Sequence, residues 1–359
     1  MNEILKQFPK GKHDMLSVPE GSSRATAPTQ ASVVYIVSML GGVLGALVAF
    51  YLVLLTLHAT DNLPPPAFSN SLCIDEKLSF MREHPAESPN LLVIGSSVAW
   101  RHVDSATVAR DSPGTRPLNG GFCGLHANQA VYVANWLLDR QPTVRQVLMI
   151  VAPQDFAECQ KKPSAVFDRE DVDKFVYGGA SRWPSYLQYF SPISLIGNAR
   201  RIKDKRANLI ELDPLVFTAF GDGPLKTATS VDGLGYGRPE PLDPTCFKAV
   251  QSLAIRLQQE GRQLMVVSTP LHPDWKTRED KNGTFLVNFD TKLREILKIT
   301  NARYWDADAQ WTPARASFTD AIHLRWSAAQ DFSAALARHV SLDMGSATPG
   351  IQETIAPSR

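Results

Sequence analysis

Two short motifs that lie far apart in the chain could carry out nucleophilic chemistry together. Gly95-Ser96-Ser97 directly follows the apolar run 91–94, and Asp320 precedes His323 by three residues, more than 220 positions later. A serine hydroxyl needs a base to act as a nucleophile, and the base needs a third group that fixes its tautomer and orientation. We therefore predict Ser97 as nucleophile, His323 as base and Asp320 as the orienting group. Each motif alone also occurs in plain β–α connections or by chance, so the surrounding elements must decide.

The elements that follow Ser97 support this hypothesis. A helix is expected over Ser105–Arg110, then a short strand from Pro117 that ends in the glycine-rich turn 119–124, then a strand over Val147–Val151 that runs into Gln154. Ligands of open α/β sheets bind outside the carboxyl ends of the strands. Backbone N–H groups of the glycine turn and the Gln154 side chain could therefore face an oxyanion at this edge.

These blocks, in this order, resemble the SGNH (GDSL-type) hydrolase superfamily. Its Gly-Asp-Ser block matches Gly95-Ser96-Ser97, and its Asp-x-x-His block matches Asp320 and His323. The resemblance implies a serine nucleophile at Ser97. Ser97 is at the third position of this turn, one residue nearer the following helix than Ser96.

The two middle blocks of the family match less evenly. Asn-x-x-x-x-Gly matches Asn119 and Gly124, whereas Gly-x-Asn-Asp matches only in part, with Ala152 for the glycine and Gln154 for the asparagine. The resemblance thus implies an oxyanion hole made by the N–H groups of Ser97 and Gly124 together with Gln154, since a glutamine can also donate.

The family also implies a fold and a setting. The fold is α/β, a three-layer flavodoxin-like sheet of about five parallel strands, and the matches span residues 91–339. The Gly-Ser-Ser and Pro-Gln variants look more like a membrane-anchored branch. That branch includes the D-alanyl transfer protein of teichoic acid modification and periplasmic polysaccharide O-acetylation proteins. No cofactor and no metal are implied.

The doubly wound pattern resumes in the second half of the chain. The expected elements are a helix from a Thr245 cap to Glu260, a strand over 264–267, a helix over 289–299, a strand over 302–305 and a helix over 327–339. The last helix would hold the loop of Asp320 and His323. We assign the hydrolase-like domain to 85–342, with an insertion over 156–240, and expect 343–359 to be a disordered tail.

Val33–Leu57 is a run of 25 residues without a charge, long enough to cross a bilayer. The apolar core of a cleaved secretory signal peptide has only about 7–15 residues. The length of this run therefore favours an uncleaved signal anchor over a cleaved signal peptide, and also over a buried core helix. Four Lys or Arg residues precede the run, and only Lys77 lies in the 20 residues after it. This bias predicts a single-pass protein of the cytoplasmic membrane, with 1–32 as a cytoplasmic tail and the domain outside, in the periplasm.

Residues 58–84 then form a stalk at Asn62–Pro66 and a lead-in helix over Ile74–His84. In the insertion, aromatic residues and the basic run Arg200–Arg206 could roof the site and bind a polysaccharide. They could equally be a local hydrophobic cluster with a solvated basic face, or a surface that rests on anionic lipid.

Four cysteines, Cys73, Cys123, Cys159 and Cys246, all follow the anchor. Export makes disulfides possible, and three complete pairings exist. Cys123 and Cys159 both follow strand ends, so we predict that pair first, against the alternative of four buried free thiols.

The formal net charge of +1 and the motifs give no indication of nucleic acid as a partner. His102, His126 and His272 lie near the site loops without an assigned role. The leading hypothesis is an anchored serine esterase or O-acyltransferase that acts on a cell-surface polysaccharide or another acylated substrate. The second is a non-catalytic protein of the same fold that binds a polysaccharide or a multi-spanning membrane acyltransferase.

Overall fold

The computed structural model describes residues 30–207, 212–237 and 240–339. The chain divides into two compact units, Met1–Thr56 and Leu57–Arg359, each of which is considered by itself. The predicted disordered tail and nearly all of the predicted cytoplasmic tail lie outside the described residues.

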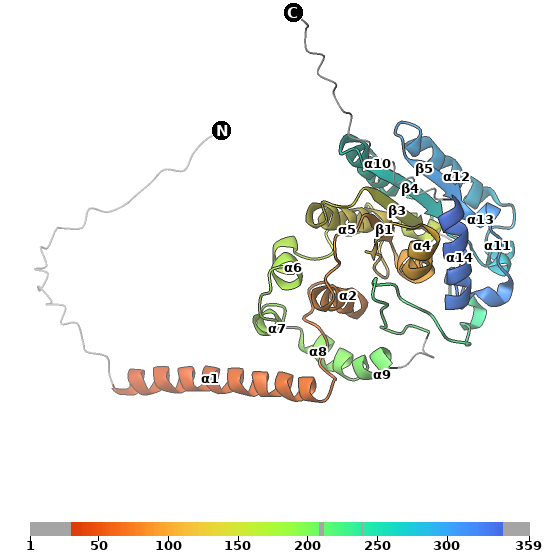
Figure 1. Cartoon of the computed structure of the whole chain (residues 1–359). Coiled ribbons are helices and arrows are strands. Elements are labelled where there is room, and N and C mark those ends of the chain that lie inside the picture. The colour runs from red at the N-terminus through yellow and green to blue at the C-terminus, as the bar shows by residue number, and fades with distance from the viewer. Residues whose placement is uncertain (1–29, 208–211, 238–239, 340–359) are drawn as a thin grey trace, which may run out of the picture. The chain divides into compact units, whose positions relative to one another are not determined.

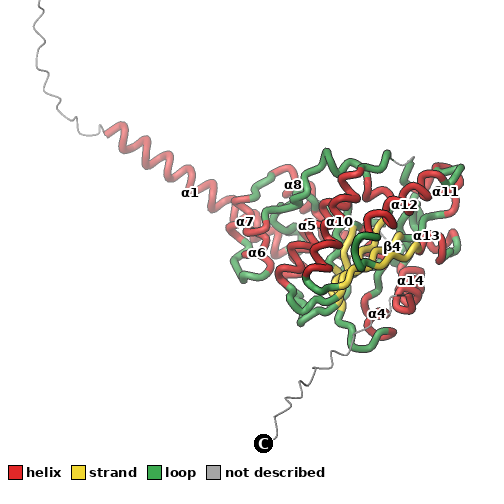
Figure 2. The backbone as a smooth tube through the Cα atoms, turned by 90° about the horizontal axis from the view of Figure 1, so that it is seen from above, coloured by secondary structure: helices red, strands yellow, loops and turns green. Residues whose placement is uncertain are grey.

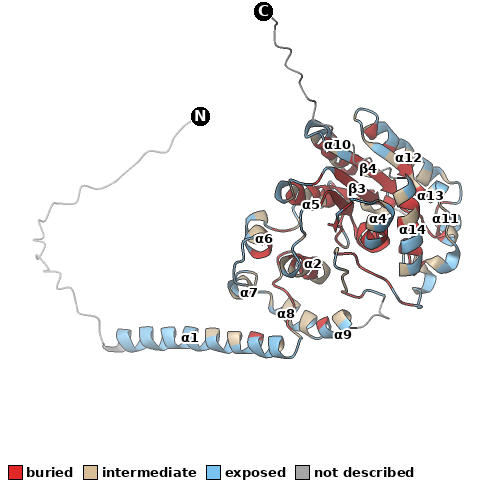
Figure 3. Cartoon of the chain, in the orientation of Figure 1, coloured by how far each residue is buried: buried red, intermediate tan, exposed pale blue. Residues whose placement is uncertain are grey.

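The described part of the first unit belongs to one long apolar helix, α1 (Gln30–Ala59), which ends three residues beyond the unit. Its segment Ser32–Ala59 has 28 residues and a mean hydropathy of 2.4. At 1.5 Å per residue it is about 42 Å long, more than the roughly 30 Å of a hydrocarbon core. Its side chains are exposed along most of the helix (Figure 3). The one apolar helix predicted before the domain is therefore confirmed as a helix of spanning length.

The second unit is built on one parallel sheet, in the order β2-β1-β3-β4-β5. Its strands are β1 (Leu91–Gly95), β2 (Pro117–Asn119), β3 (Gln146–Val151), β4 (Gln263–Ser268) and β5 (Arg303–Asp306). This is the flavodoxin-like order, and it confirms the predicted fold class. Figure 2 shows the strands enclosed by helices, which explains why β1 and β3 are buried at every position.

Helices cover both faces of the sheet and make three layers (Figure 1). Two separate hydrophobic cores lie on the two faces. The first face carries α5 (Ala127–Arg140), α10 (Pro244–Gln259) and α12 (Thr284–Leu297). The second face carries α3 (Ser97–His102), α4 (Ser105–Asp111) and α14 (Trp326–His339). Trp136 and Phe332 are among the largest fully buried side chains of the two cores.

Several element boundaries differ from the prediction. The side chain of Asp243, not Thr245, caps α10, because its carboxylate accepts the Thr245 N–H at 2.8 Å. Helix α12 begins at Thr284, five residues before the predicted start. Helices α3 and α5 were not predicted at all.

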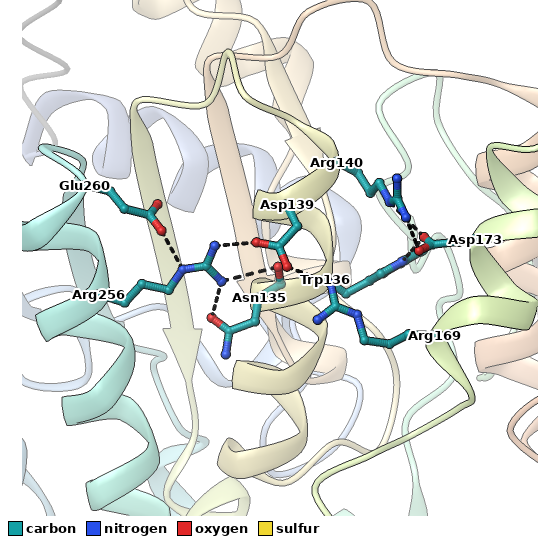
Figure 4. A network of polar contacts seen from close by, with 8 residues as sticks. All are labelled: Asn135, Trp136, Asp139, Arg140, Arg169, Asp173, Arg256 and Glu260. Atoms are coloured by element: carbon teal, nitrogen blue, oxygen red, sulfur yellow. Dashed lines mark hydrogen bonds and ion pairs between the residues drawn. The ribbon is translucent and has the colours of Figure 1, made fainter.

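Helix α5 is tied to its neighbours by a polar network on its outer side (Figure 4). Arg256 of α10 donates to the Asn135 side chain at 2.7 Å and pairs with Asp139. Trp136 donates to Asp173 of α6 (Arg169–Val176) at 2.7 Å, and Arg140 pairs with the same carboxylate. The network therefore fastens the insertion to the sheet through α5.

The predicted insertion, 156–240, has no strand among its described residues. After α6 it contains α7 (Trp183–Gln188), α8 (Pro192–Ala199), α9 (Ile202–Ala207) and the 3-10 turn η2 (Asp232–Leu234). The remaining elements are α2 (Leu72–Glu83), the 3-10 turns η1 (Pro153–Phe156) and η3 (Arg315–Ser317), and the short helices α11 (Pro273–Glu279) and α13 (Ala307–Gln310).

The predicted Cys123–Cys159 disulfide is wrong. Cys73 pairs with Cys123 and Cys159 with Cys246, so the alternative of free thiols is wrong as well. Cys123 follows β2 and Cys159 follows β3, but β1 lies between these strands. Two strand spacings come to about 9–10 Å, beyond the ~7 Å that a disulfide can bridge. The partners come instead from the N-terminal turns of α2 and α10.

Candidate active site

A glycine turn places Ser97 at the first position of α3. Gly95 ends β1 with φ 141°, and a Cβ atom there would lie 2.2 Å from the carbonyl oxygen of Ile150 on β3. Only glycine fits this turn without moving the strand beside it. Ser96 is buried after the turn, whereas Ser97 is partly exposed. The turn thus presents the hydroxyl of Ser97, not that of Ser96.

Ser97, His323 and Asp320 form one continuous line of hydrogen bonds. The Oγ atom of Ser97 lies 2.7 Å from Nε2 of His323, and Nδ1 of His323 lies 2.7 Å from Oδ2 of Asp320. The structure therefore brings together all three residues of the predicted nucleophile, base and orienting group, although 226 positions separate Ser97 from His323.

Asp320 is held ionised and in place by the backbone around it. Its Oδ1 atom accepts the N–H groups of Ile322 at 2.8 Å and His323 at 2.7 Å. Burial opposes its charge, but the hydrogen bonds from His323 and from these N–H groups outweigh burial and lower the pKa of Asp320. A carboxylate at Nδ1 makes that nitrogen the donor, which leaves Nε2 free to accept the Ser97 proton.

The loop that carries Asp320 and His323 is fixed from two other loops. The Ala321 N–H donates to the carbonyl of Leu234 at 3.0 Å, and the Val231 N–H donates to that of Thr319 at 2.7 Å. From the β4–α11 connection, the His272 N–H donates to the Ala321 carbonyl at 2.9 Å. The end of the insertion thus reaches the loop of Asp320 and His323 through residues 231–236.

His102, the last residue of α3, supports the loop that carries Asp320 and His323. Its Nε2 accepts the N–H of Leu324, the residue after His323, at 3.0 Å, and its Nδ1 lies 2.7 Å from the hydroxyl of Thr269. Since Nε2 accepts, Nδ1 carries the proton of a neutral ring. Complete burial and the neighbouring His323 lower the pKa of His102 well below its ordinary value. One six-residue helix therefore begins with Ser97 and ends with the residue that supports the His323 loop.

The other two histidines named from the sequence have local roles. Nδ1 of His126 lies 2.8 Å from the Ala157 carbonyl oxygen, just before α5. Nδ1 of His272 accepts the Asp274 N–H at 3.1 Å and so caps α11.

The turns after β2 and β3 flank the Ser97 turn, because β1 lies between these two strands. After β2, the Asn119 side chain accepts the Gly121 N–H at 2.9 Å and donates to the Ala99 carbonyl of α3 at 3.1 Å. A Cβ atom on Gly121 would lie 2.6 Å from the backbone nitrogen of Trp100, so this turn packs directly against α3. Gly124 follows with φ 65°.

Gln154 lies in η1, directly after β3. Both polar atoms of its amide are buried, and neither has a hydrogen-bond partner within the described residues. Buried amides are normally satisfied, so an unsatisfied one at this edge is a feature that a bound ligand would correct. Gly124 and Gln154 thus occupy the two turns beside Ser97, and their role as oxyanion donors stays a prediction.

Three residues near the site were missed from the sequence. Arg101 is buried, lies 4.1 Å over the Trp100 ring and donates to Asp213 at 2.8 Å; burial lowers its pKa to about 10. The Tyr236 ring lies 6.3 Å from that of His323. Asp155 accepts the Ala152 N–H at 2.9 Å, and burial raises its pKa to about 7. The available signal was the position of Arg101 one helical turn after Ser97, on the same face of α3.

Within residues 30–207, 212–237 and 240–339, no three His, Cys, Asp or Glu side chains are grouped closely enough to hold a metal ion.

No protein-family model and no curated protein sequence matches the chain. Among solved structures, it is similar to an inhibitor-bound aryl esterase of M. smegmatis, with 13% identity and a TM-score of 0.33, over 70% of this chain and 98% of that one. A carbohydrate acetylesterase family member from Sinorhizobium meliloti has 10% identity and a TM-score of 0.33, over 72% and 99%. Another carbohydrate acetylesterase of that organism has 13% identity and a TM-score of 0.34, over 71% and 99%. At these scores the similarity carries no argument about function.

Proposed function

We propose that the chain is a membrane-anchored serine esterase or O-acyltransferase that acts on a cell-surface polysaccharide. The observation that carries the proposal is the line from Ser97 Oγ through His323 to Asp320, with 2.7 Å at each link. A hydroxyl, an imidazole and a carboxylate in this order are the parts of an acyl-transfer site. The polysaccharide as substrate is an expectation from the motif resemblance.

In the first step the Ser97 oxygen attacks the carbonyl carbon of an acyl ester while its proton passes to Nε2 of His323. The carbonyl electron pair moves to its oxygen and forms the tetrahedral oxyanion. We assign the N–H groups of Ser97 and Gly124 and the Gln154 amide as its donors. The Ser97 N–H is available for this, since the first N–H groups of a helix have no acceptor within it.

In the second step the ester C–O bond breaks, and the sugar oxygen leaves with the proton that His323 holds. The acyl group remains on Ser97 as an ester. His323 then takes a proton from water or from an acceptor hydroxyl, whose oxygen attacks the acyl carbon. The bond between Ser97 Oγ and the acyl carbon breaks, and His323 returns the proton to the Ser97 oxygen. Water gives hydrolysis, and a sugar hydroxyl gives O-acyl transfer. Asp320 stays ionised throughout and balances the charge on His323.

The test uses the purified full chain in detergent with an aryl acetate and with an acetylated oligosaccharide. We expect release of acetate from both, and acetylation of an added unmodified oligosaccharide if the protein is a transferase. If neither substrate is turned over while the chain still binds the polysaccharide, the protein is a non-catalytic binding partner.

We further propose that α1 spans the cytoplasmic membrane with the N-terminus inside and the domain outside. Helix length and the lysine and arginine bias support this orientation. A reporter enzyme fused after residue 339 should be active only outside the cytoplasm; cytoplasmic activity there would reverse the orientation.

A further inference from the structure

The surface formed by α7 and α8 exposes apolar side chains that face neither core. Leu187 is 50% exposed, Ile193 86% and Ile196 55%, and Phe190 is also exposed. We call these four residues the apolar patch. Helix α8 has no buried residue, and its partly buried residues, Ser194, Leu195, Asn198 and Ala199, lie on its other side. Exposed apolar side chains gathered within residues 187–196 are typical of an interaction site.

A basic segment adjoins the apolar patch. Arg200 and Arg201, which follow α8, are exposed, and so are Lys203 and Asp204 of α9. The two other cations of the segment are already paired, Lys205 with Asp213 and Arg206 with Glu76. The exposed charge next to the patch is therefore positive, which suits an anionic surface.

The patch is tied to the point where the chain leaves α1. The Tyr186 hydroxyl of α7 donates to the Pro64 carbonyl at 2.6 Å. Arg206 of α9 donates to the carbonyl oxygens of Leu63 at 3.1 Å and Asp61 at 3.4 Å. Pro64 is five residues beyond Ala59, the last residue of α1, so the chain cannot carry it more than about 18 Å away. The stretch 63–66, predicted as a stalk, is buried beside these contacts.

We infer that the apolar patch and its basic segment rest on the outer surface of the membrane that α1 crosses. This inference rests on the proposed anchoring and is independent of the ester chemistry. The short tether keeps α7 and α9 near the bilayer, the apolar side chains enter the interfacial layer, and the cations contact anionic head groups. The lipid surface is favoured over a protein partner because the tether alone brings the patch to it.

The test measures the depth of nitroxide labels in the full chain, reconstituted in vesicles of equal parts phosphatidylcholine and phosphatidylglycerol. Single labels are placed by Ile193→Cys in the patch, Ile299→Cys after α12, and Val43→Cys in α1. Residue 299 is a matched control, since it is 63% exposed and α12 lies well apart from α8 (Figure 1). The four native cysteines are disulfide-bonded and do not compete for the label.

Collision rates with oxygen, which is enriched in lipid, and with a water-soluble nickel chelate report the depth. We expect the oxygen-to-nickel ratio to be high at 43, and several-fold higher at 193 than at 299. Arg200→Glu combined with Arg201→Glu should lower the ratio at 193. Lys248→Glu combined with Lys281→Glu, the same charge change at two other exposed sites, should leave it unchanged.

A shielded residue 43 with equal ratios at 193 and 299 would overturn the lipid contact and leave the anchor intact, which would turn the search to a protein partner for the patch. A residue 43 that meets the nickel chelate freely would overturn the anchor, and with it this inference.

Discussion

The two halves of the candidate site are prepared to different degrees. On one side, Ser97, His323 and Asp320 are joined by hydrogen bonds of 2.7 Å, and the His323 loop is fixed by His102, Leu234 and His272. On the other side, the Gln154 amide is buried without a partner within the described residues. The proton-transfer half is thus already joined by hydrogen bonds, whereas Gln154, the proposed oxyanion donor, has no such partner among the described residues.

The largest effect is expected at the start of the hydrogen-bond line. Ser97→Ala removes the nucleophile and should reduce ester turnover by about 10⁴–10⁶-fold, as loss of a serine nucleophile does elsewhere. Ser96→Ala is the matched control and should change turnover little, because the Ser96 hydroxyl is buried behind the turn. Steady-state kinetics of both variants decide the point, and equal losses would show that the turn, not the Ser97 hydroxyl, matters.

The second effect concerns the tautomer of His323. Asp320→Asn replaces an acceptor at Nδ1 by an amide that can donate, and should cost about 10⁴-fold in kcat. The hydrogen bonds from Ile322 and His323 to the side chain oxygen can persist in this variant, so its melting temperature should fall only slightly. A large loss of stability with a proportionate loss of activity would instead make Asp320 a structural residue.

The third effect tests the oxyanion half of the site. Gln154→Ala removes a proposed oxyanion donor and should lower kcat by about 10²–10³-fold. Because the amide has no partner in the described structure, the same change should leave the free energy of unfolding nearly unchanged or raise it. Kinetics and denaturant titration of this one variant separate the two quantities. Unchanged kcat would remove Gln154 from the oxyanion hole.

The smallest catalytic effect is expected at His102, which acts through the loop. His102→Phe leaves the Leu324 N–H without an acceptor, at a cost of about 1–3 kcal/mol, and should lower kcat by about tenfold or more. His102→Gln, whose side-chain oxygen can replace Nε2 as acceptor, should restore most of the activity. A Gln variant as slow as the Phe variant would refute this positioning role.

The pKa of His102 adds a stability signature to the same variants. The folded state disfavours its protonation, so the unfolded state binds more protons as the pH falls below the ordinary value of 6.5. The contribution of His102 to stability should therefore be complete above pH 6.5 and decline below it. His102→Gln should lose this part of the decline in denaturant titrations at several pH values.

Much of the proton-transfer half could be predicted from the sequence, for a local reason. The nucleophile and the Asp-His pair lie in short segments whose residue types and spacing indicate acyl-transfer chemistry. Buried strands such as 91–94 and 147–151 are recognisable as continuous apolar runs. The sheet order then brings their carboxyl ends to one edge.

The rest depended on contacts between distant segments. His102 is recognisable as a support only because Leu324, 222 positions later, donates to it. The disulfides were mispredicted because strand ends that are successive in sequence are not neighbours in the sheet, where β1 separates β2 from β3. The part of the insertion that reaches the His323 loop, residues 231–236, was not recognisable in the sequence, because it does so through backbone hydrogen bonds that have no sequence pattern.

The central claim is that the Ser97 oxygen is activated by His323. The most direct measurement treats the full chain with a fluorophosphonate and maps the adduct by peptide mass spectrometry, beside Ser97→Ala and Ser96→Ala. The account predicts one adduct, on Ser97, in wild type and in Ser96→Ala, and none in Ser97→Ala. An unlabelled wild-type chain, or an adduct that persists in Ser97→Ala, would contradict it.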